Sequence, residues 1–424
     1  MAKMSKPVAS PAPQPPYIKR AHLRNVPPLR NVKVDFKPGL NIIIGKNGSG
    51  KTNFMKLLSE LIDLQQDKFK GIGCEVSFDI AGQEVDITFK ESKAQKKSLG
   101  RALLSPRNLA LSITASNKKV VVEDKNLFTA IVSLLPSVSS GKWGLGYEVL
   151  PIWHGLPNHQ LLIVDRGTDL SFDNSGGMSI VDSPEVPWQL LGVLERSFID
   201  SMVPYDVGSP ANQFASIESG VIHKFISARI NARLGKLNAY LPTYSPIERV
   251  RLGEQFQVYP NSAKDEIIVK GLMLEYLIGG DWLPFSALSD GTKRIFYLIG
   301  ELATKEIFFE PGSNDSLIDF DLDKIIFLEE PELGIHPDQL QLLLQLIREV
   351  SKEHQVIMTT HSPQTLDMLS AQELDRITIC EFIPGKGTQM RKLSAAKKAK
   401  AKAYLRDNGF LSEFWRFSNL EDPD

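Results

Sequence analysis

The sequence of 424 residues has few of the features that mark secreted, disulfide-rich or membrane proteins. Its two cysteines, Cys74 and Cys380, are far apart and lack the spacing of a metal site or a redox motif. No apolar run reaches the roughly 18 residues of a membrane-spanning helix, and the N-terminus has no apolar signal core. We therefore expect a cytoplasmic protein that makes no use of a membrane.

The chain also lacks a large net charge, because its 49 lysine and arginine residues nearly balance its 50 aspartate and glutamate residues. A chain without a global positive field would contact DNA only through local patches. Two patches are candidates for such a contact. One holds Lys93, Lys96, Lys97 and Arg101, and the other holds Lys397, Lys398, Lys400 and Lys402. Because runs of charge are most often solvated faces, DNA stays an open possibility as a partner.

The chain lacks internal repeats and sustained heptads, so a long coiled coil is not expected. Residues 1–16 are rich in proline, alanine and serine, which predicts a disordered arm. In 17–90 and 280–390, short strands alternate with helical spacing. This alternation predicts an α/β head with a mixed β-sheet, split by an insertion.

The remaining segments are less regular. Residues 91–279 combine glycine- and serine-rich turns and short strands with helical spacing around 188–202 and 216–241. This pattern predicts an inserted, mainly helical lobe with some β structure. Residues 391–424 predict a lysine-rich helix followed by an aromatic anchor.

A glycine-rich segment between a buried strand and a helix carries the strongest chemical signal. It matches G-x-x-x-x-G-K-[ST] in full, with the β-branched strand 40–44 before it and helical spacing after it. Such glycines let successive backbone N–H groups curl around phosphates, and the helix that follows points its positive end at them. We expect nucleotide contacts from Gly45, Lys46, Asn47, Gly48, Ser49, Gly50, Lys51, Thr52 and Asn53.

The chemistry of this segment predicts ATP and Mg²⁺ as the bound groups. Lys51 would supply a point charge to the β- and γ-phosphates, and the Thr52 hydroxyl would ligate Mg²⁺. Farther along the chain, the apolar strand 324–328 ends in two carboxylates. Glu329 is expected to hold Mg²⁺ directly or through water, and Glu330 to polarise the attacking water. The alternative is that Glu329 and Glu330 have no role in chemistry and only form the solvated end of a strand.

The segment Ser289, Asp290 and Gly291 opens a helix and by itself predicts an ordinary N-cap. Its place about 40 residues before the acidic strand end makes it resemble the signature segment of ABC-type ATPases, with Asp290 at the position of the usual second glycine. The resemblance implies binding to the γ-phosphate of a nucleotide held by another subunit. His361, which ends a strand, likewise resembles the switch histidine that senses the γ-phosphate.

The phosphate loop, the signature-like segment, the acidic strand end and His361 follow one another along the chain in this order. Together they resemble the soluble SMC/RecF/OLD-like group of ABC-type ATPases, many of which serve DNA repair or anti-phage defence. The resemblance is strongest at 41–53, at the Glu-Glu-Pro-Glu-Leu-Gly-Ile-His-Pro run of 329–337 and at the Thr-His-Ser-Pro of 360–363. It implies that 331–337 is the D-loop, which reports across a dimer. Glu329 stands where most relatives have an aspartate, and no convincing Q-loop residue is found.

Departures from the group narrow the implied function. About 60 residues follow His361, too few for the Toprim nuclease domain of OLD-type proteins, so no built-in nuclease is expected. The coiled-coil arms of SMC proteins are absent. More than 230 residues separate Thr52 from Ser289, far more than in transporter ATPases, so a transporter subunit is not expected.

Three functions stay open. The leading one is a switch in which ATP joins chains through composite sites into a homodimer or higher homo-oligomer, and hydrolysis releases them. Because no effector segment is recognised, a separately encoded nuclease or toxin would read the closed state in anti-phage defence. The alternatives are a DNA-binding repair or recombination ATPase, and a nucleotide-sensing scaffold with little turnover.

Overall fold

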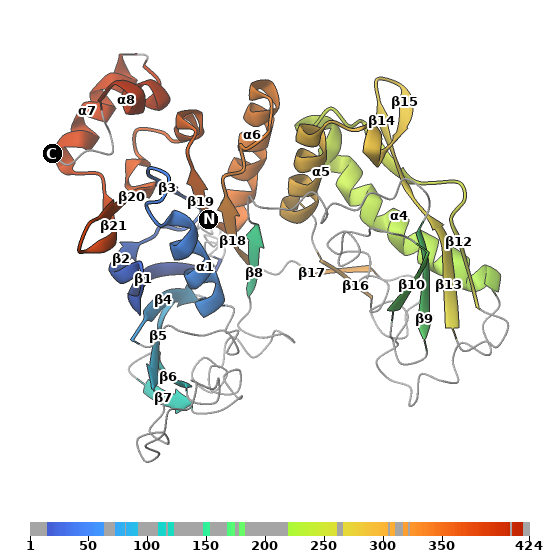
Figure 1. Ribbon diagram of the computed structural model, residues 1–424, viewed down its shortest axis with the longest axis horizontal. Coiled ribbons are helices and arrows are strands. Elements are labelled where there is room, and N and C mark those ends of the chain that lie inside the picture. Colours follow the sequence, from blue (N-terminus) through green and yellow to red (C-terminus); the bar gives the residue numbers. More distant parts are fainter. Residues whose placement is uncertain are drawn as a thin grey trace, which may run out of the picture. The chain divides into compact units, whose positions relative to one another are not determined.

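The computed structural model describes residues 15–62, 73–80, 82–91, 109–115, 118–122, 147–152, 168–173, 178–182, 219–260, 266–303, 306–309, 317–320, 323–407 and 409–418. The predicted arm therefore lies almost wholly outside the described residues. The chain divides into two compact units (Figure 1). The first comprises Met1–Trp153, Asp323–Pro331 and Arg348–Asp424, and the second comprises His154–Leu322 and Glu332–Ile347.

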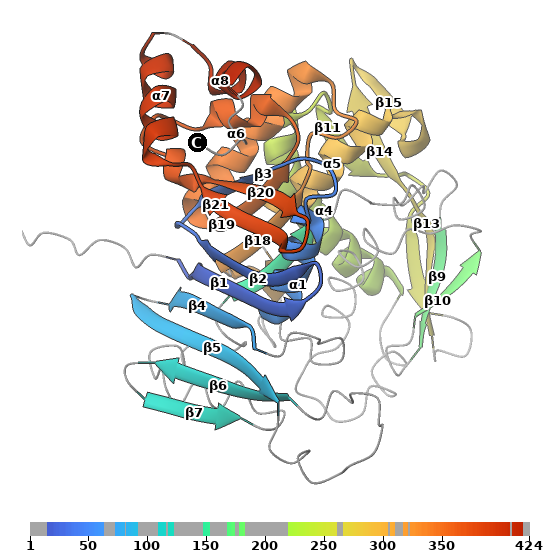
Figure 2. The same cartoon turned by 60° about the vertical axis from the view of Figure 1, so that its left-hand side comes forward.

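An antiparallel sheet of six strands forms one layer of the first unit, in the order β2-β1-β4-β5-β6-β7 (Figure 2). Its strands are β1 (Tyr17–Val26), β2 (Leu29–Asp35), β4 (Glu75–Ile80), β5 (Gln83–Glu91), β6 (Leu109–Ala115) and β7 (Lys118–Val122). The first unit thus continues past the boundary predicted at residue 90. The reason is that β6 pairs with β5 and β7 pairs with β6, so both strands belong to the same sheet.

The second layer of this unit is a mostly parallel sheet with the order β21-β20-β3-β19-β18-β8. Its strands are β3 (Leu40–Ile44), β8 (Tyr147–Ile152), β18 (Asp323–Glu329), β19 (Gln355–Thr360), β20 (Ile377–Ile383) and β21 (Gly387–Lys392). Every residue of β3 and β19 is buried, as expected for parallel strands that are covered on both faces. Strand β21 pairs antiparallel with β20 through a tight hairpin.

Helix α1 (Lys51–Ile62) joins the two sheets of the first unit into one core. Its apolar side chains Phe54, Leu58 and Leu61 are fully buried. They share that core with residues of both sheets, among them Ile18, Leu23, Val76 and Phe78 from the antiparallel sheet and Ile43, Ile325, Phe327 and Ile357 from the parallel sheet. Full burial of one such side chain contributes roughly 1.5–3 kcal/mol. This packing holds the start of α1 at the end of β3.

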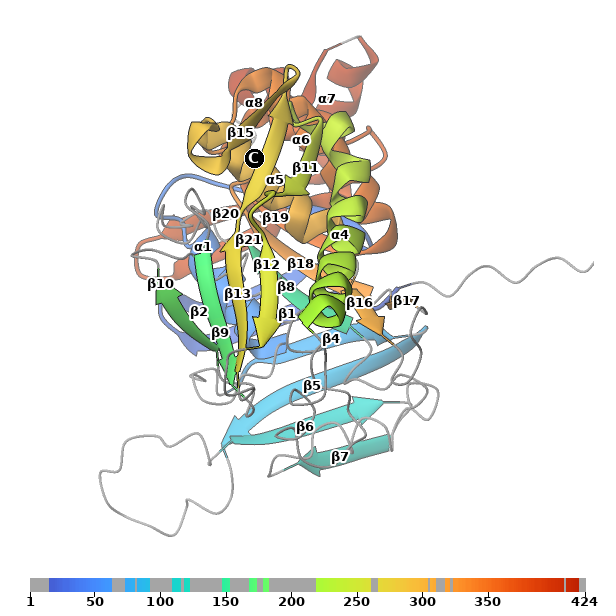
Figure 3. The same cartoon turned by 90° about the vertical axis from the view of Figure 1, so that its right-hand side faces the viewer.

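The second unit contains helix α4 (Ser219–Tyr244), helix α5 (Asp290–Ala303) and small antiparallel sheets. Its strands are β9 (Thr168–Asp173), β10 (Met178–Asp182), β11 (Arg249–Leu252), β12 (Gln257–Pro260), β13 (Glu266–Leu272), β14 (Leu274–Ile278), β15 (Asp281–Pro284), β16 (Glu306–Phe309) and β17 (Leu317–Phe320). Helix α4 lies along β11 and β12 (Figure 3). The described part of 91–279 thus holds more strand than its helical spacing indicates, and 188–202 lies outside the described residues.

Three aromatic rings orient the segment that leads into α5. Tyr276 comes from β14, Phe285 from the short 3₁₀ helix η8 (Phe285–Ala287), and Phe296 from α5. The ring of Tyr276 lies 5.5 Å from that of Phe285 and 5.1 Å, edge to face, from that of Phe296. Because all three rings are buried, they fix the direction in which α5 begins.

Two helices follow β21, namely α7 (Ala395–Arg406) and α8 (Leu411–Ser418). Phe414 of the predicted aromatic anchor is buried, with its ring 5.7 Å from that of Tyr404. Helix α8 packs on the 3₁₀ helix η9 (Pro363–Met368), where the Ser412 amide donates to Asp367 at 2.8 Å. None of the described helices is long and apolar enough to cross a membrane.

The lysine face predicted for α7 is smaller in the structure. Lys397 is 9% exposed, and Lys398 forms an ion pair with Asp375. Of the four lysines, only Lys400 and Lys402 are exposed. The second candidate patch, with Lys93, Lys96, Lys97 and Arg101, lies outside the described residues.

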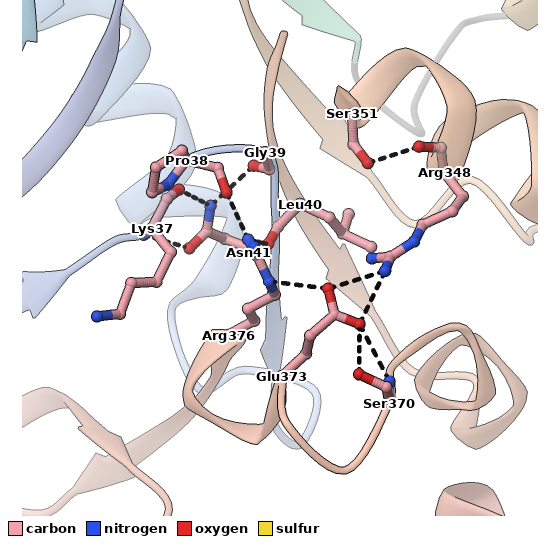
Figure 4. Close-up of polar contacts among 10 residues, drawn as sticks. All are labelled: Lys37, Pro38, Gly39, Leu40, Asn41, Arg348, Ser351, Ser370, Glu373 and Arg376. Atoms are coloured by element: carbon pink, nitrogen blue, oxygen red, sulfur yellow. Dashed lines mark hydrogen bonds and ion pairs between the residues drawn. The ribbon is translucent and has the colours of Figure 1, made fainter. Parts of the chain in front are cut away.

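A polar network holds the end of β3 that lies opposite the phosphate loop (Figure 4). Glu373 is its centre, since Arg348 Nη2 donates to both carboxylate oxygens at 2.8 Å. Arg376 Nε lies 3.1 Å from the same carboxylate, and Ser370 donates to it from its amide and its hydroxyl at 3.1 and 2.9 Å. Arg376 also donates to the main-chain oxygen of Leu40 at 2.9 Å. The network therefore ties the entry of β3 to the segment that precedes β20.

Glu373→Gln is expected to lower the free energy of unfolding by about 1–3 kcal/mol at pH 7, because two arginines lose their charged partner. Burial by itself would raise the pKa of the Glu373 carboxyl, but hydrogen bonds from Ser370 and Arg348 outweigh it and hold the pKa below its usual value of 4.5. The stabilisation is therefore present above pH 4.5 and is lost as the pH falls through the lower pKa of the folded state. Urea denaturation at neutral and acidic pH measures both effects.

The matched control is Glu349→Gln, because Glu349 forms an exposed ion pair with Lys352. It should change the free energy of unfolding by less than about 0.5 kcal/mol. Equal losses in the two variants, or a Glu373→Gln deficit that does not shrink in acid, would contradict this account of the network.

Candidate functional site

The phosphate loop predicted from the sequence connects β3 to α1 in the first unit. Gly45 and Gly50 have φ angles of +156° and +102°, which residues with a Cβ rarely adopt. The Ser49 amide donates to the Lys46 oxygen at 3.2 Å, and the Phe54 amide donates to the Gly50 oxygen at 2.9 Å. These bonds curl the loop and begin the helix. Lys46, Asn47, Gly48 and Asn53 are exposed, whereas Ser49 is buried.

Lys51 is the first residue of α1 and is 5% exposed. Its ammonium donates to the main-chain oxygens of Gly45 at 2.8 Å and Lys46 at 3.3 Å, and it lies 2.9 Å from His361 Nε2. A buried charge needs such acceptors, because loss of water around it is costly. The loop therefore holds a positive charge against its own backbone, next to the predicted switch histidine.

The Glu329 side chain lies on the face of the parallel sheet that α1 covers. Along β18, it follows Ile325 and Phe327 at alternate positions, and both belong to the core that contains α1. Glu329 is 2% exposed, and the Thr52 hydroxyl donates to its carboxylate. The two residues predicted to hold Mg²⁺ are thus in direct contact.

Glu330 leaves the strand in a left-handed conformation, with a φ angle of +44°. Such values are uncommon for residues other than glycine and are concentrated at functional sites. The Glu330 amide donates to the Thr359 oxygen at 3.0 Å, and its carboxylate lies 2.6 Å from His361 Nε2. Because the backbone turns at Glu330, the two consecutive carboxylates have different partners. Glu329 contacts Thr52, and Glu330 contacts His361.

Two buried hydroxyl groups beside these residues have no hydrogen-bond partner within the described part of the chain, Ser49 Oγ and Thr359 Oγ1. Ser49 and Thr359 are 4% and 0% exposed, so both hydroxyls are costly to leave unpaired. Thr359 is paired in register with Glu329 and Ile43, which places its side chain on the same face of the sheet. The site thus retains hydrogen-bonding capacity for a phosphate or a hydrated ion.

These residues fit MgATP. Among the described residues, no group of three or more His, Cys, Asp or Glu side chains could hold a metal ion by itself. Mg²⁺ does not need such a cage, since it keeps several waters and binds through one or two protein oxygens together with substrate phosphates. Thr52 and Glu329 supply oxygens of that kind, and Lys51 supplies the complementary charge for the phosphates.

Ser289, Asp290 and Gly291 belong to the second unit, at the start of α5. The Ser289 hydroxyl caps the helix, because it accepts from the Thr292 amide at 3.2 Å. Asp290 is exposed, and a Cβ on Gly291 would lie 2.9 Å from the main-chain oxygen of Gly334, in the predicted D-loop. Ser289 therefore acts as the N-cap of α5, as expected. The contact of this segment with a nucleotide stays a prediction.

The structure thus brings together five of the predicted site residues, namely Lys51, Thr52, Glu329, Glu330 and His361. Sequence reasoning missed Thr359, and it missed Cys380 and Thr388, which contact the phosphate loop from the β20–β21 hairpin. No local pattern marks these three, because each reaches the site only through the pairing of strands.

Two sequence families match the chain. The family described as “AAA ATPase domain” matches residues 17–136, which include the phosphate loop. The family described as “AAA domain, putative AbiEii toxin, Type IV TA system” matches residues 193–367, which include the predicted signature, the acidic strand end and His361. Both predicted parts of the head therefore match ATPase domains.

Among curated proteins, the chain is similar to the Septu protein PtuA of Bacillus thuringiensis, with 26% identity over 172 residues, 40% of this chain and 41% of that protein. It is also similar to the retron Ec83 probable ATPase of Escherichia coli, with 32% identity over 87 residues, 20% of this chain and 16% of that protein. The matches span less than half the length of either relative.

Solved structures of SMC heads align with most of the chain at low similarity. One is an SMC head bound to the C-terminal winged-helix domain of ScpA, with a TM-score of 0.44 and 13% identity over 90% of this chain and 99% of that chain. Another is the SMC head domain from Thermotoga maritima, with a TM-score of 0.41 and 12% identity over 89% of this chain and 99% of that chain.

Proposed function

We propose that this chain, a P-loop ATPase of the soluble ABC-type group, binds and hydrolyses MgATP at a site that a second copy of the chain completes. The observation that carries the proposal is the contact of Glu330 with His361 beside the Lys51 ammonium. A carboxylate and an imidazole next to a phosphate-binding lysine are suited to position water and to respond to the terminal phosphate.

Each residue has a distinct task in this proposal. Glu330 orients the attacking water and accepts its proton. His361, 2.6 Å from that carboxylate, restrains its rotation and is close enough to Lys51 to respond to the same phosphate. Lys51 offsets the negative charge on the phosphate oxygens. Mg²⁺, held through Thr52 and Glu329, would supply further positive charge at the phosphates.

Ser289 and Gly291 are proposed to act across a homodimer. The first backbone N–H groups of α5 have no partners within the helix, and its dipole favours an anion there. A terminal phosphate that contacts the phosphate loop of one chain and α5 of its partner would hold the two chains together. ATP binding then favours the dimer, and hydrolysis favours its release.

Ser289→Asp separates this role from helix capping. Aspartate caps a helix about as well as serine, so the free energy of unfolding should change by less than about 0.5 kcal/mol. Its negative charge would repel the terminal phosphate, so the ATP-dependent dimer should be lost while each chain still binds ATP. Light scattering coupled to size-exclusion chromatography, with and without MgATP, measures the dimer, and nucleotide titration measures binding.

Ser289→Asn is the matched control for this variant, since asparagine also caps the helix but carries no charge. It should dimerise more strongly with ATP than Ser289→Asp does. If Ser289→Asp retains the wild-type ATP-dependent dimer, Ser289 is an N-cap and nothing more, and the composite site is wrong.

The biological role that we infer is anti-phage defence, in which the ATP-dependent dimer controls a separately encoded nuclease or toxin. Its support is the naming of the relatives as a Septu protein and a retron ATPase, together with the toxin–antitoxin description of the family matched at 193–367. The test is a plaque assay on cells that carry the chain with its neighbouring genes. Protection that persists when Lys51 is replaced by methionine would contradict the role.

A further inference from the structure

The hairpin of β20 and β21 contacts the phosphate loop directly. Thr388 Oγ1 donates to the main-chain oxygen of Ser49 at 2.8 Å, and Cys380 Sγ donates to the same oxygen at 3.5 Å. Thr388 and Cys380 are 0% and 1% exposed, so the hairpin shields this oxygen from solvent. The two residues follow Ser49 by 339 and 331 positions, and the contact arises because β20 pairs with β3.

The hairpin leaves no room for a side chain at Gly45 or Gly50 of the loop. A Cβ atom on Gly50 would lie 2.2 Å from Thr388 Oγ1, and one on Gly45 would lie 2.1 Å from the main-chain oxygen of Cys380. Ordinary van der Waals contacts of a Cβ atom are 3.4–4 Å. The glycines at both ends of the loop are therefore needed for close packing on the hairpin as well as for their φ angles.

The hairpin also contacts the turn between β1 and β2, on the side away from the phosphate loop. The Thr388 amide donates to the main-chain oxygen of Pro28 at 3.1 Å, and a Cβ on Gly387 would lie 2.3 Å from that oxygen. Pro28 belongs to the turn between β1 and β2, and β21 lies beside β2 (Figure 2). Strand β21 thus contacts the antiparallel sheet as well as the phosphate loop, and both contacts restrain its position.

We propose that Thr388 is a positioning residue for nucleotide binding, because it sets the orientation of the peptide between Ser49 and Gly50. In a trans peptide, the C=O and N–H groups point in opposite directions. Since Thr388 holds the Ser49 oxygen toward the hairpin, the Gly50 N–H points away from it. A loop amide that is oriented before the nucleotide arrives lowers the ordering cost of binding. The inference rests on the proposed binding of ATP at this loop.

Thr388→Val tests the role with a side chain of the same shape. A methyl group in the place of Oγ1 cannot donate, and 2.8 Å is too short for it, since carbon–oxygen contacts need about 3.3–3.6 Å. The Ser49 carbonyl should turn, and the Gly50 N–H should turn with it. We expect ATP affinity to fall about tenfold, the effect of roughly one buried hydrogen bond. Thr388→Ser retains the hydroxyl and should recover most of the affinity.

Thr378→Val is the matched control on the same hairpin. Thr378 is 1% exposed on β20, and its hydroxyl accepts from Lys392 Nζ at 2.8 Å. Each valine variant loses one hydrogen bond made by a buried threonine hydroxyl of the hairpin, so their melting temperatures should fall by similar amounts. If Thr388 positions the loop for the nucleotide, only Thr388→Val should also lose ATP affinity.

The experiment measures two quantities for the wild type and the three variants. Titration with a fluorescent ATP analogue gives the Kd, and thermal unfolding without nucleotide gives the Tm. A loss of affinity confined to Thr388→Val, and recovered in Thr388→Ser, would establish the positioning role. Equal Kd values for wild type and Thr388→Val, or equal losses in both valine variants, would overturn the inference alone. A wild-type chain that does not bind ATP would overturn the proposed function with it.

Discussion

Glu330→Gln is expected to lower the rate of ATP hydrolysis by roughly 10²–10⁴-fold, the usual contribution of a general base. Glutamine has the shape of glutamate, so it can keep the turn at φ +44° and the contact with His361, but it cannot take a proton from water. Binding of ATP should persist because Lys51 and the loop are unchanged. The variant should therefore accumulate as an ATP-bound dimer, and phosphate release with size-exclusion chromatography measures both consequences.

Glu381→Gln is a suitable control, because Glu381 is a partly buried glutamate of the same unit that pairs with Arg391 at 3.4 Å. Its hydrolysis rate should match that of the wild type. If Glu330→Gln elutes at the same size with and without ATP, the proposed dimer switch is wrong. If wild type and Glu330→Gln hydrolyse ATP at the same negligible rate, the chain is a nucleotide sensor with little turnover.

Lys51→Met is expected to weaken ATP binding on the order of 100-fold, which corresponds to the loss of a charged hydrogen bond. Methionine has a similar length and can occupy the buried space, but it offers no charge to the phosphates. Because the Lys51 ammonium donates to the main-chain oxygens of Gly45 and Lys46, the variant also removes two hydrogen bonds from the curled loop. Isothermal titration with a non-hydrolysable ATP analogue measures the affinity.

Lys56→Met is the matched control, since Lys56 is an exposed lysine on the same helix. It should bind ATP as the wild type does. Thermal unfolding without nucleotide distinguishes a local effect from loss of the fold. An affinity that is unchanged in Lys51→Met would contradict the assignment of the phosphate loop, and with it every role that depends on that loop.

Most of the first unit near the loop could be predicted from local patterns. The strand before the loop, the helix after it and the acidic strand end depend on residue spacing within short windows, and each lies where the spacing predicts it. The boundary at residue 90 could not be predicted, because β6 and β7 are short strands whose place depends on pairing with β5. In the second unit, spacing at 216–241 predicted α4, whereas the positions and pairing of the strands around it were not predicted.

For the site, the sequence by itself determined the candidate residues, because the glycine run with Lys51 and the paired Glu329 and Glu330 are each recognised from neighbours along the chain. Only the tertiary structure decided which of them meet. Glu330 reaches His361 because β18 pairs with β19, and Thr388 reaches Ser49 because β20 pairs with β3 in the parallel sheet. Strand order is set by long-range packing rather than by local spacing, so no pattern in the sequence could place these contacts.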